Sequence, residues 1–188
     1  MSFFTFIEIL NLIILTIAIG YIFSGYIQES LLPQRGYKRR TFDWHNFKFA
    51  LLVSAPGVVF HELSHKFMAL AFGLDAMFKI WFPGLGIAIF LKLIQSPFLI
   101  IAPGYVLITG TSSPLQSVFT AFAGPLINLI MWVGATFILN RAKKLTRRQA
   151  TILYLTSRIN LFLFIFNMIP IPPLDGSKVV LSLIKLIF

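Results

Sequence analysis

The chain has 188 residues, of which 57% are hydrophobic and 12% are charged. Soluble domains average about 45–50% apolar and about 25% charged residues, so this composition excludes a disordered chain and a coiled coil and favours an integral membrane protein. Despite the net charge of +10 at pH 7, so apolar a chain is not expected to bind nucleic acid. At about 20 residues per membrane helix, the length allows roughly four to six spans.

The first predicted element is a transmembrane helix over residues 3–27, an almost uninterrupted apolar run that can cross the roughly 30 Å hydrocarbon layer. A cleaved signal peptide fits it poorly because the run has no basic n-region and no small-residue cleavage site. Residues 34–48 are basic with interleaved aromatics, which indicates a loop at the lipid headgroups. A second span is predicted over residues 49–72, ended by Gly73 and Asp75.

Residues 77–110 consist of short apolar runs that proline and glycine interrupt. Each run has the length of a strand rather than of a helix. Open strand edges cannot face lipid, so we expect a membrane-associated β-hairpin or re-entrant segment that packs on protein or lines a wet cavity. A single short helix over residues 97–110 is the alternative.

The rest of the chain predicts a third span over residues 115–140, a second basic loop over residues 141–148 and a fourth span over residues 150–168. Residues 177–188 are apolar, but 12 residues cover only about 18 Å, too little for an upright span. The expected fold class is an all-α polytopic membrane protein with about four to five transmembrane helices and a β-hairpin or re-entrant segment after the second span.

The second span contains the motif HExxH, formed by His61, Glu62 and His65. Residues four apart lie on one face of a helix, so both imidazoles can reach one metal ion, and the adjacent glutamate can act as a general base on water. Ionisable groups inside a membrane span cost roughly 2.5–3.5 kcal/mol each. This cost favours a functional site over three polar residues that merely pack against partner helices.

A catalytic zinc ion usually has three protein ligands and one open position. The chain has no cysteine, and His45 lies in the basic loop, so a carboxylate is the expected third ligand. Asp175 is the best candidate because it follows a run of prolines that breaks the fourth span, and Gly176 allows the chain to turn close to a neighbour. Taken alone, Asp175 would be read as a helix N-cap.

The motif HExxH, combined with NxxPxPxLDG over residues 167–176, resembles the site-2 protease family of intramembrane zinc metalloproteases. Both motifs match in full. The sequence Ala123-Gly124-Pro125 followed by Asn128 is similar to a third, weaker landmark of the family. Gly84 and Gly86 lie where the family places a membrane-associated β-hairpin. The resemblance covers roughly residues 49–180.

The resemblance implies one zinc ion per chain, bound by His61, His65 and Asp175, with Glu62 as the catalytic base. It implies that the substrate is a transmembrane segment of another protein, cleaved within or near the membrane. Further residues become candidate substrate contacts by the same resemblance: Asn128, Asn167, Gly84 and Gly86. We hypothesise that the interrupted runs near residues 83–90 bind the substrate by adding it as a strand.

The expected organisation is a single transmembrane protease domain over residues 1–188, a compact form of the family. Its core covers about residues 49–180, and residues 1–34 form an extra N-terminal helix. The chain has no room for the peptide-binding domain of some members, and helices that follow Asp175 in longer members are expected to be missing or truncated.

Two other functions use the same ligands: a non-proteolytic membrane metal-binding or transport protein, and a zinc enzyme that acts on lipids or lipidated peptides. Glu62 argues against the first, because a binding site needs no base. We expect a multi-pass protein of a prokaryotic cell membrane. The positive-inside rule would place the two basic loops in the cytoplasm, whereas the family resemblance would place them outside, and we favour the latter.

Overall fold

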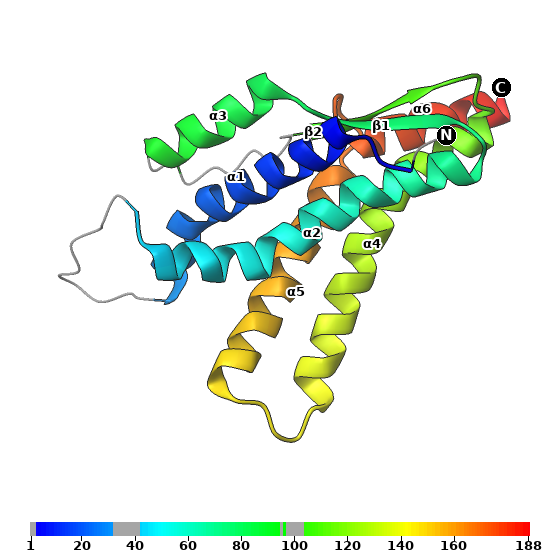
Figure 1. Cartoon of the computed structure of the whole chain (residues 1–188). Coiled ribbons are helices and arrows are strands. Elements are labelled where there is room, and N and C mark those ends of the chain that lie inside the picture. The colour runs from blue at the N-terminus through cyan, green and yellow to red at the C-terminus, as the bar shows by residue number, and fades with distance from the viewer. Residues whose placement is uncertain (1–2, 32–41, 95, 97–103) are drawn as a thin grey trace. The chain divides into compact units, whose positions relative to one another are not determined.

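The computed structural model describes residues 3–31, 42–94, 96 and 104–188. It is mostly helical, with one small two-stranded sheet, β1–β2, so the expected fold class is confirmed. In chain order the elements are α1 (Phe6–Leu31), α2 (Trp44–Ala71), β1 (Asp75–Ile80), α3 (Phe82–Leu93), β2 (Gly104–Thr109), α4 (Pro114–Arg141), α5 (Arg147–Asn167) and α6 (Asp175–Ile187) (Figure 1).

Four of the described helices, α1, α2, α4 and α5, are long and apolar enough to cross a membrane. They are the four spans that hydropathy predicts. The 13-residue α6 is not one of them, because a helix of that length covers only about 20 Å.

The second helix begins earlier than its apolar run. The Asp43 carboxylate accepts hydrogen bonds from the backbone N–H groups of His45 (2.8 Å) and Asn46 (3.0 Å), which caps the helix. His45 and Lys48 are therefore helical, and assigning them to a loop was wrong. The helix ends as predicted, because Gly73 adopts a φ of +74°, the left-handed conformation that commonly terminates helices.

Capping boxes define the starts of α4 and α5. The side chain of Ser113 accepts from the N–H of Gln116, whose side chain accepts from the N–H of Ser113; Thr146 and Gln149 make the same reciprocal pair. Only residues 142–146 connect α4 with α5, so the two helices run antiparallel and pack on each other, and α4 also packs against α6.

The region after α2 differs from its prediction. The strands are β1 and β2, and residues 83–90, expected to be strands, belong to helix α3. Pro83 lies in the first turn of α3, where its fixed φ suits a helix and its missing N–H breaks no helical bond. The hypothesis that residues 83–90 pair with substrate as a strand is therefore wrong. Residues 97–103 lie outside the described residues, so the alternative helix is tested only at Gly104–Thr109, which is a strand.

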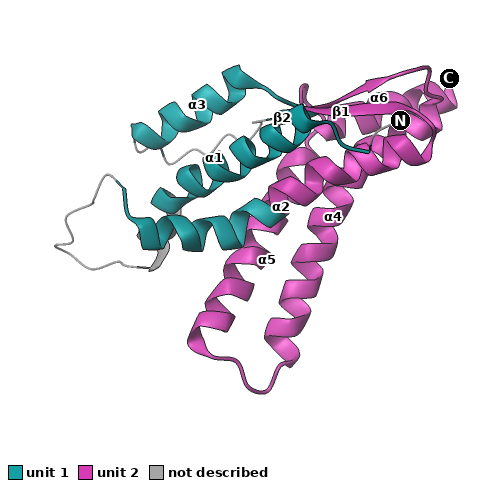
Figure 2. Ribbon diagram, in the orientation of Figure 1, with its two compact units in different colours: residues 1–56, 79–105 teal, residues 57–78, 106–188 magenta. Residues whose placement is uncertain are grey.

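The chain divides into two compact units (Figure 2). The first comprises residues 1–56 and 79–105, with α1 and α3; the second comprises residues 57–78 and 106–188, with α4, α5 and α6. Within the first unit, the Lys92 ammonium lies 3.0 Å from the centre of the Tyr21 ring and donates to Ser24 Oγ (3.3 Å), which ties α3 to α1. The single protease domain over residues 1–188 stays a prediction.

Candidate metal centre

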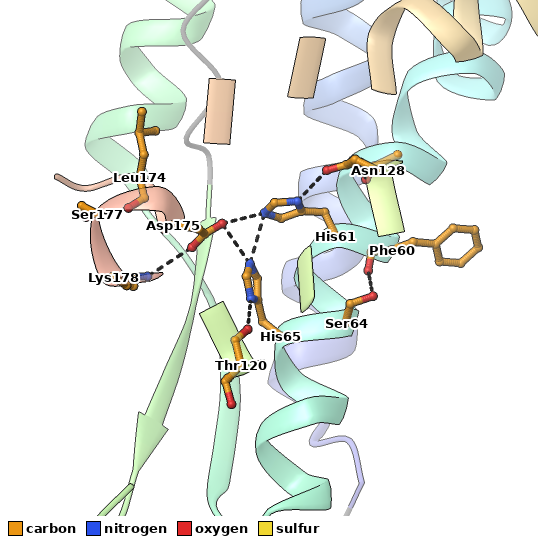
Figure 3. Close-up of polar contacts among 11 residues, drawn as sticks. Phe60, His61, Ser64, His65, Thr120, Asn128, Leu174, Asp175, Ser177 and Lys178 are labelled. Atoms are coloured by element: carbon orange, nitrogen blue, oxygen red, sulfur yellow. Dashed lines mark hydrogen bonds and ion pairs between the residues drawn. The ribbon is translucent and has the colours of Figure 1, made fainter. Parts of the chain in front are cut away.

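The second unit brings two histidines that are four residues apart together with an aspartate more than a hundred residues further along the chain. His61 and His65 project from α2, and Asp175 is the first residue of α6. Asp175 Oδ2 lies 3.1 Å from Nε2 of each histidine, and the two Nε2 atoms are 3.2 Å apart (Figure 3). All three side chains are buried.

These distances fit a single metal ion. Two donor atoms that each lie about 2.0–2.1 Å from a tetrahedral ion are roughly 3.4 Å from each other, close to the separations observed here. Within the described part of the chain, His61, His65 and Asp175 form the group of histidine and acidic residues that could hold an ion.

The protonation of the imidazoles also fits a metal. His61 Nδ1 lies 2.7 Å from Asn128 Oδ1, and His65 Nδ1 lies 2.7 Å from the carbonyl oxygen of Thr120. Both oxygens can only accept, so each Nδ1 carries a hydrogen, and each ring turns its Nε2 towards the metal position. When both rings are neutral, two lone pairs and a carboxylate oxygen repel one another at 3.1–3.2 Å, and a cation between them removes that repulsion.

A glycine on α4 makes room for this arrangement. A Cβ atom on Gly124 would lie 2.7 Å from Nε2 and Cε1 of His61 and in still closer contact with Nε2 of His65. Any larger residue would push against the atoms that face the metal position. Gly124 belongs to the weaker family landmark, Ala123-Gly124-Pro125 followed by Asn128. The structure adds that this glycine lies against both imidazoles.

The LDG turn delivers the third donor. The fifth helix ends at Asn167, and α6 starts at Asp175 after a short connection. A Cβ on Gly176 would collide with the carbonyl oxygen of Met168 and lie 2.7 Å from that of Ile169, so only glycine allows the start of α6 to approach the end of α5. The remaining carboxylate oxygen, Asp175 Oδ1, lies 3.4 Å from Nζ of Lys178.

Comparison with known proteins agrees with this geometry. The model of peptidase family M50 matches residues 134–188. A protein of Methanocaldococcus jannaschii named "Putative zinc metalloprotease" is 36% identical over 177 residues, which cover 92% of this chain and 82% of the relative. The chain belongs to peptidase family M50.

This is the site-2 protease family that the two motifs indicate. A second relative, from a Synechocystis strain and also named "Putative zinc metalloprotease", is 33% identical over 135 residues, or 72% of this chain and 31% of the relative. No solved structure matches the chain. Membership of M50, together with four helices of membrane length, identifies a membrane protein.

Glu62, which follows His61 in the HExxH motif on α2, is also buried. Within the described residues, its carboxylate has no hydrogen-bond partner. It differs in this from Asp175, whose two oxygens face the imidazoles and Lys178. A buried carboxylate without a protein partner is available to bind water or substrate.

The residues expected to contact substrate lie on three different helices. Asn128 is fully buried and both of its amide hydrogens are donated within the protein, which suits a residue that orients His61. Asn167 is the last residue of α5 and is half-buried, without a hydrogen-bond partner for its side chain among the described residues. Gly84 and Gly86 belong to α3 in the first unit. Substrate contact by these four residues stays a prediction.

Proposed function

We propose that this protein is a zinc-dependent endopeptidase that hydrolyses a peptide bond within or near a transmembrane segment of a membrane-protein substrate. The observation that carries the proposal is the convergence of His61 Nε2, His65 Nε2 and Asp175 Oδ2 within 3.2 Å; the helix of the two histidines also carries the buried Glu62. Both relatives are named as zinc metalloproteases, which supports zinc as the ion, one per chain.

The roles of the residues follow from their chemistry. When bound, zinc supplies Lewis-acid polarisation and lowers the pKa of water towards about 7. Glu62 accepts the proton of the attacking water, whose oxygen bonds to the peptide carbonyl carbon. The C–N bond then breaks, and Glu62 returns the proton to the leaving amine, so the carboxylate is regenerated. His61, His65 and Asp175 would hold the zinc ion throughout the reaction.

The substrate class follows from the surroundings of the site. Two of the ligands, His61 and His65, lie on α2, which is long and apolar enough to cross a membrane. The third ligand, Asp175, is the first residue of the shorter helix α6. Peptide bonds of a substrate helix are protected by their own hydrogen bonds, so the substrate has to present an unwound segment. A soluble peptidase would not need its base and two of its ligands on a membrane span, where ionisable groups are costly.

The lipid bilayer is the second proposed partner. At the start of α2, the ring of Trp44 stacks on Phe47 at 5.2 Å, and the Lys48 ammonium lies 5.4 Å from the Trp44 ring. Aromatic and basic side chains together are typical of the headgroup layer. We propose four membrane crossings, the family orientation with residues 141–148 outside, and a prokaryotic cell membrane, since the relatives are archaeal and cyanobacterial. Protease accessibility of residues 141–148 tests the orientation.

Glu62→Gln tests the enzymatic assignment. We expect the variant to keep its zinc and to lose cleavage of a membrane-helix substrate by about 10²- to 10⁴-fold, the usual contribution of a general base. Ser64→Ala is the matched control on the same motif, because the Ser64 hydroxyl donates to the Phe60 carbonyl of its own helix (2.7 Å). Normal cleavage by Glu62→Gln would refute the proposal. Zinc binding without any cleavage by the wild type would favour a metal-binding protein instead.

A further inference from the structure

Asn160 on α5 connects to the candidate metal centre without touching it. Its side chain is fully buried. Asn160 Nδ2 donates to the carbonyl oxygen of Thr156 (2.8 Å), and Asn160 Oδ1 accepts from Asn128 Nδ2 (2.9 Å). Asn128 in turn contacts His61. Three helices, α2, α4 and α5, thus share one buried chain of hydrogen bonds.

Backbone carbonyls set the direction of this chain. The Thr156 carbonyl can only accept, so the amide NH₂ of Asn160 faces it and the amide oxygen faces Asn128. The NH₂ of Asn128 then donates to Asn160 Oδ1 and to the carbonyl oxygen of Gly57 (3.0 Å). This leaves Asn128 Oδ1 facing His61 Nδ1, which must carry the hydrogen.

We propose that Asn160 is a positioning residue that, through Asn128, holds His61 in the tautomer with Nδ1 protonated and Nε2 free to bind the metal. The inference rests on the proposed metal centre. It assigns a role to a residue that lies outside both sequence motifs and belongs to neither the ligands nor the base.

Packing holds Asn160 in this orientation. A Cβ atom on Gly57 would lie 2.8 Å from Asn160 Oδ1, so α2 lies directly against the amide. Without Asn160, Asn128 would keep a single acceptor for its two amide hydrogens, and the reversed amide, with NH₂ towards His61, would lose one of the two oxygen–oxygen contacts that disfavour it. The reversed amide would require the opposite His61 tautomer, with the hydrogen at Nε2, where it blocks the metal.

His65 is an internal reference. Its Nδ1 donates directly to the Thr120 carbonyl, so its tautomer does not depend on either asparagine. A second polar pair between α4 and α5, Thr136 Oγ1 and Ser157 Oγ at 2.8 Å, makes no hydrogen bond to a metal-facing residue among the described residues. Ser157→Ala is therefore the matched control for loss of an α4–α5 hydrogen bond.

The experiment compares wild type, Asn160→Leu, Asn160→Asp and Ser157→Ala as full-length proteins in detergent. Leucine removes the acceptor for Asn128, whereas aspartate retains it. Zinc affinity is measured by competition with a chelator. Histidine ring ¹⁵N shifts are recorded on the metal-free proteins, in which the whole chain contributes only 3 histidines.

We expect Asn160→Leu to bind zinc about tenfold more weakly, at the lower end of the 10- to 100-fold typical of residues behind metal ligands. His61 should show mixed tautomers in this variant, while the His65 signals stay unchanged. Asn160→Asp should restore the wild-type tautomer, and Ser157→Ala should match wild type.

Unchanged His61 shifts and affinity in Asn160→Leu would overturn the inference, as would an equal loss in Ser157→Ala. If Asn160→Leu fails to fold, Asn160→Asp decides: a folded variant with mixed His61 tautomers contradicts the proposal. A wild type that binds no zinc would refute the metal centre, whereas the ring shifts of the metal-free proteins would still test the role of Asn160.

Discussion

Substitution of Gly124 by alanine tests the geometry of the candidate metal centre most directly. The added Cβ would meet Nε2 and Cε1 of His61 at 2.7 Å and would lie closer still to Nε2 of His65. Contacts below 3.0 Å are essentially never observed for real Cβ atoms, so the rings have to turn. The atoms that must move are the ones that face the metal.

The expected loss of metal affinity can be estimated from the contacts. Overfilling a well-packed site costs about 1–3 kcal/mol. Turning the rings weakens the Nδ1–H bonds to Asn128 and Thr120, for about 1 kcal/mol more. Metal binding demands the original ring positions, whereas the metal-free rings can relax. A penalty of about 2–4 kcal/mol corresponds to roughly 30- to 1,000-fold weaker binding.

The assay is zinc content and chelator competition on purified protein, with thermal unfolding of the metal-free form as a second measurement. Alanine is favoured over glycine in a helix by about 0.5–1 kcal/mol, so we expect no general loss of helical structure. Gly134→Ala is the control: it lies on the same helix, and a Cβ there meets no atom within 4 Å. Wild-type zinc affinity in Gly124→Ala would refute the placement of the imidazoles against α4.

Three further predictions concern the surroundings. Lys178→Met should weaken zinc binding severalfold in chelator competition, because Lys178 pairs with Asp175 Oδ1 (3.4 Å) and leaves Oδ2 for the metal. The ammonium is exposed, which limits the size of the effect. An unchanged zinc affinity in this variant would contradict the prediction. Gly57→Ala should lower the free energy of unfolding by about 1–3 kcal/mol, since its Cβ would press on Asn160; denaturant titration checks this. Burial lowers the pKa of Lys92 to about 8. The rate at which an amine-specific reagent labels Lys92, measured by mass spectrometry, should therefore rise as the pH passes through 8. A labelling rate that rises only near pH 10 would contradict this lowered pKa.

Local rules already predicted much of the fold. Apolar runs identified the helices of membrane length because a span needs about 20 apolar residues whatever it packs against. Their ends were less predictable, since polar caps such as Asp43 lengthen a helix beyond its apolar run. Pro83 and its neighbouring glycines indicated broken strands, but proline in a first turn is compatible with a helix, and α3 forms there.

The same division applies to the site. The four-residue spacing of His61 and His65 by itself determined that both rings share a face of α2, because helical periodicity is a local property. The sequence also pointed to Asp175 through its motif. Only the tertiary structure decided that Asp175 Oδ2 lies 3.1 Å from both rings, that Gly124 makes room for them and that Asn160 orients Asn128. These contacts join residues far apart in the chain, and their distances depend on how whole helices pack, which no local pattern encodes.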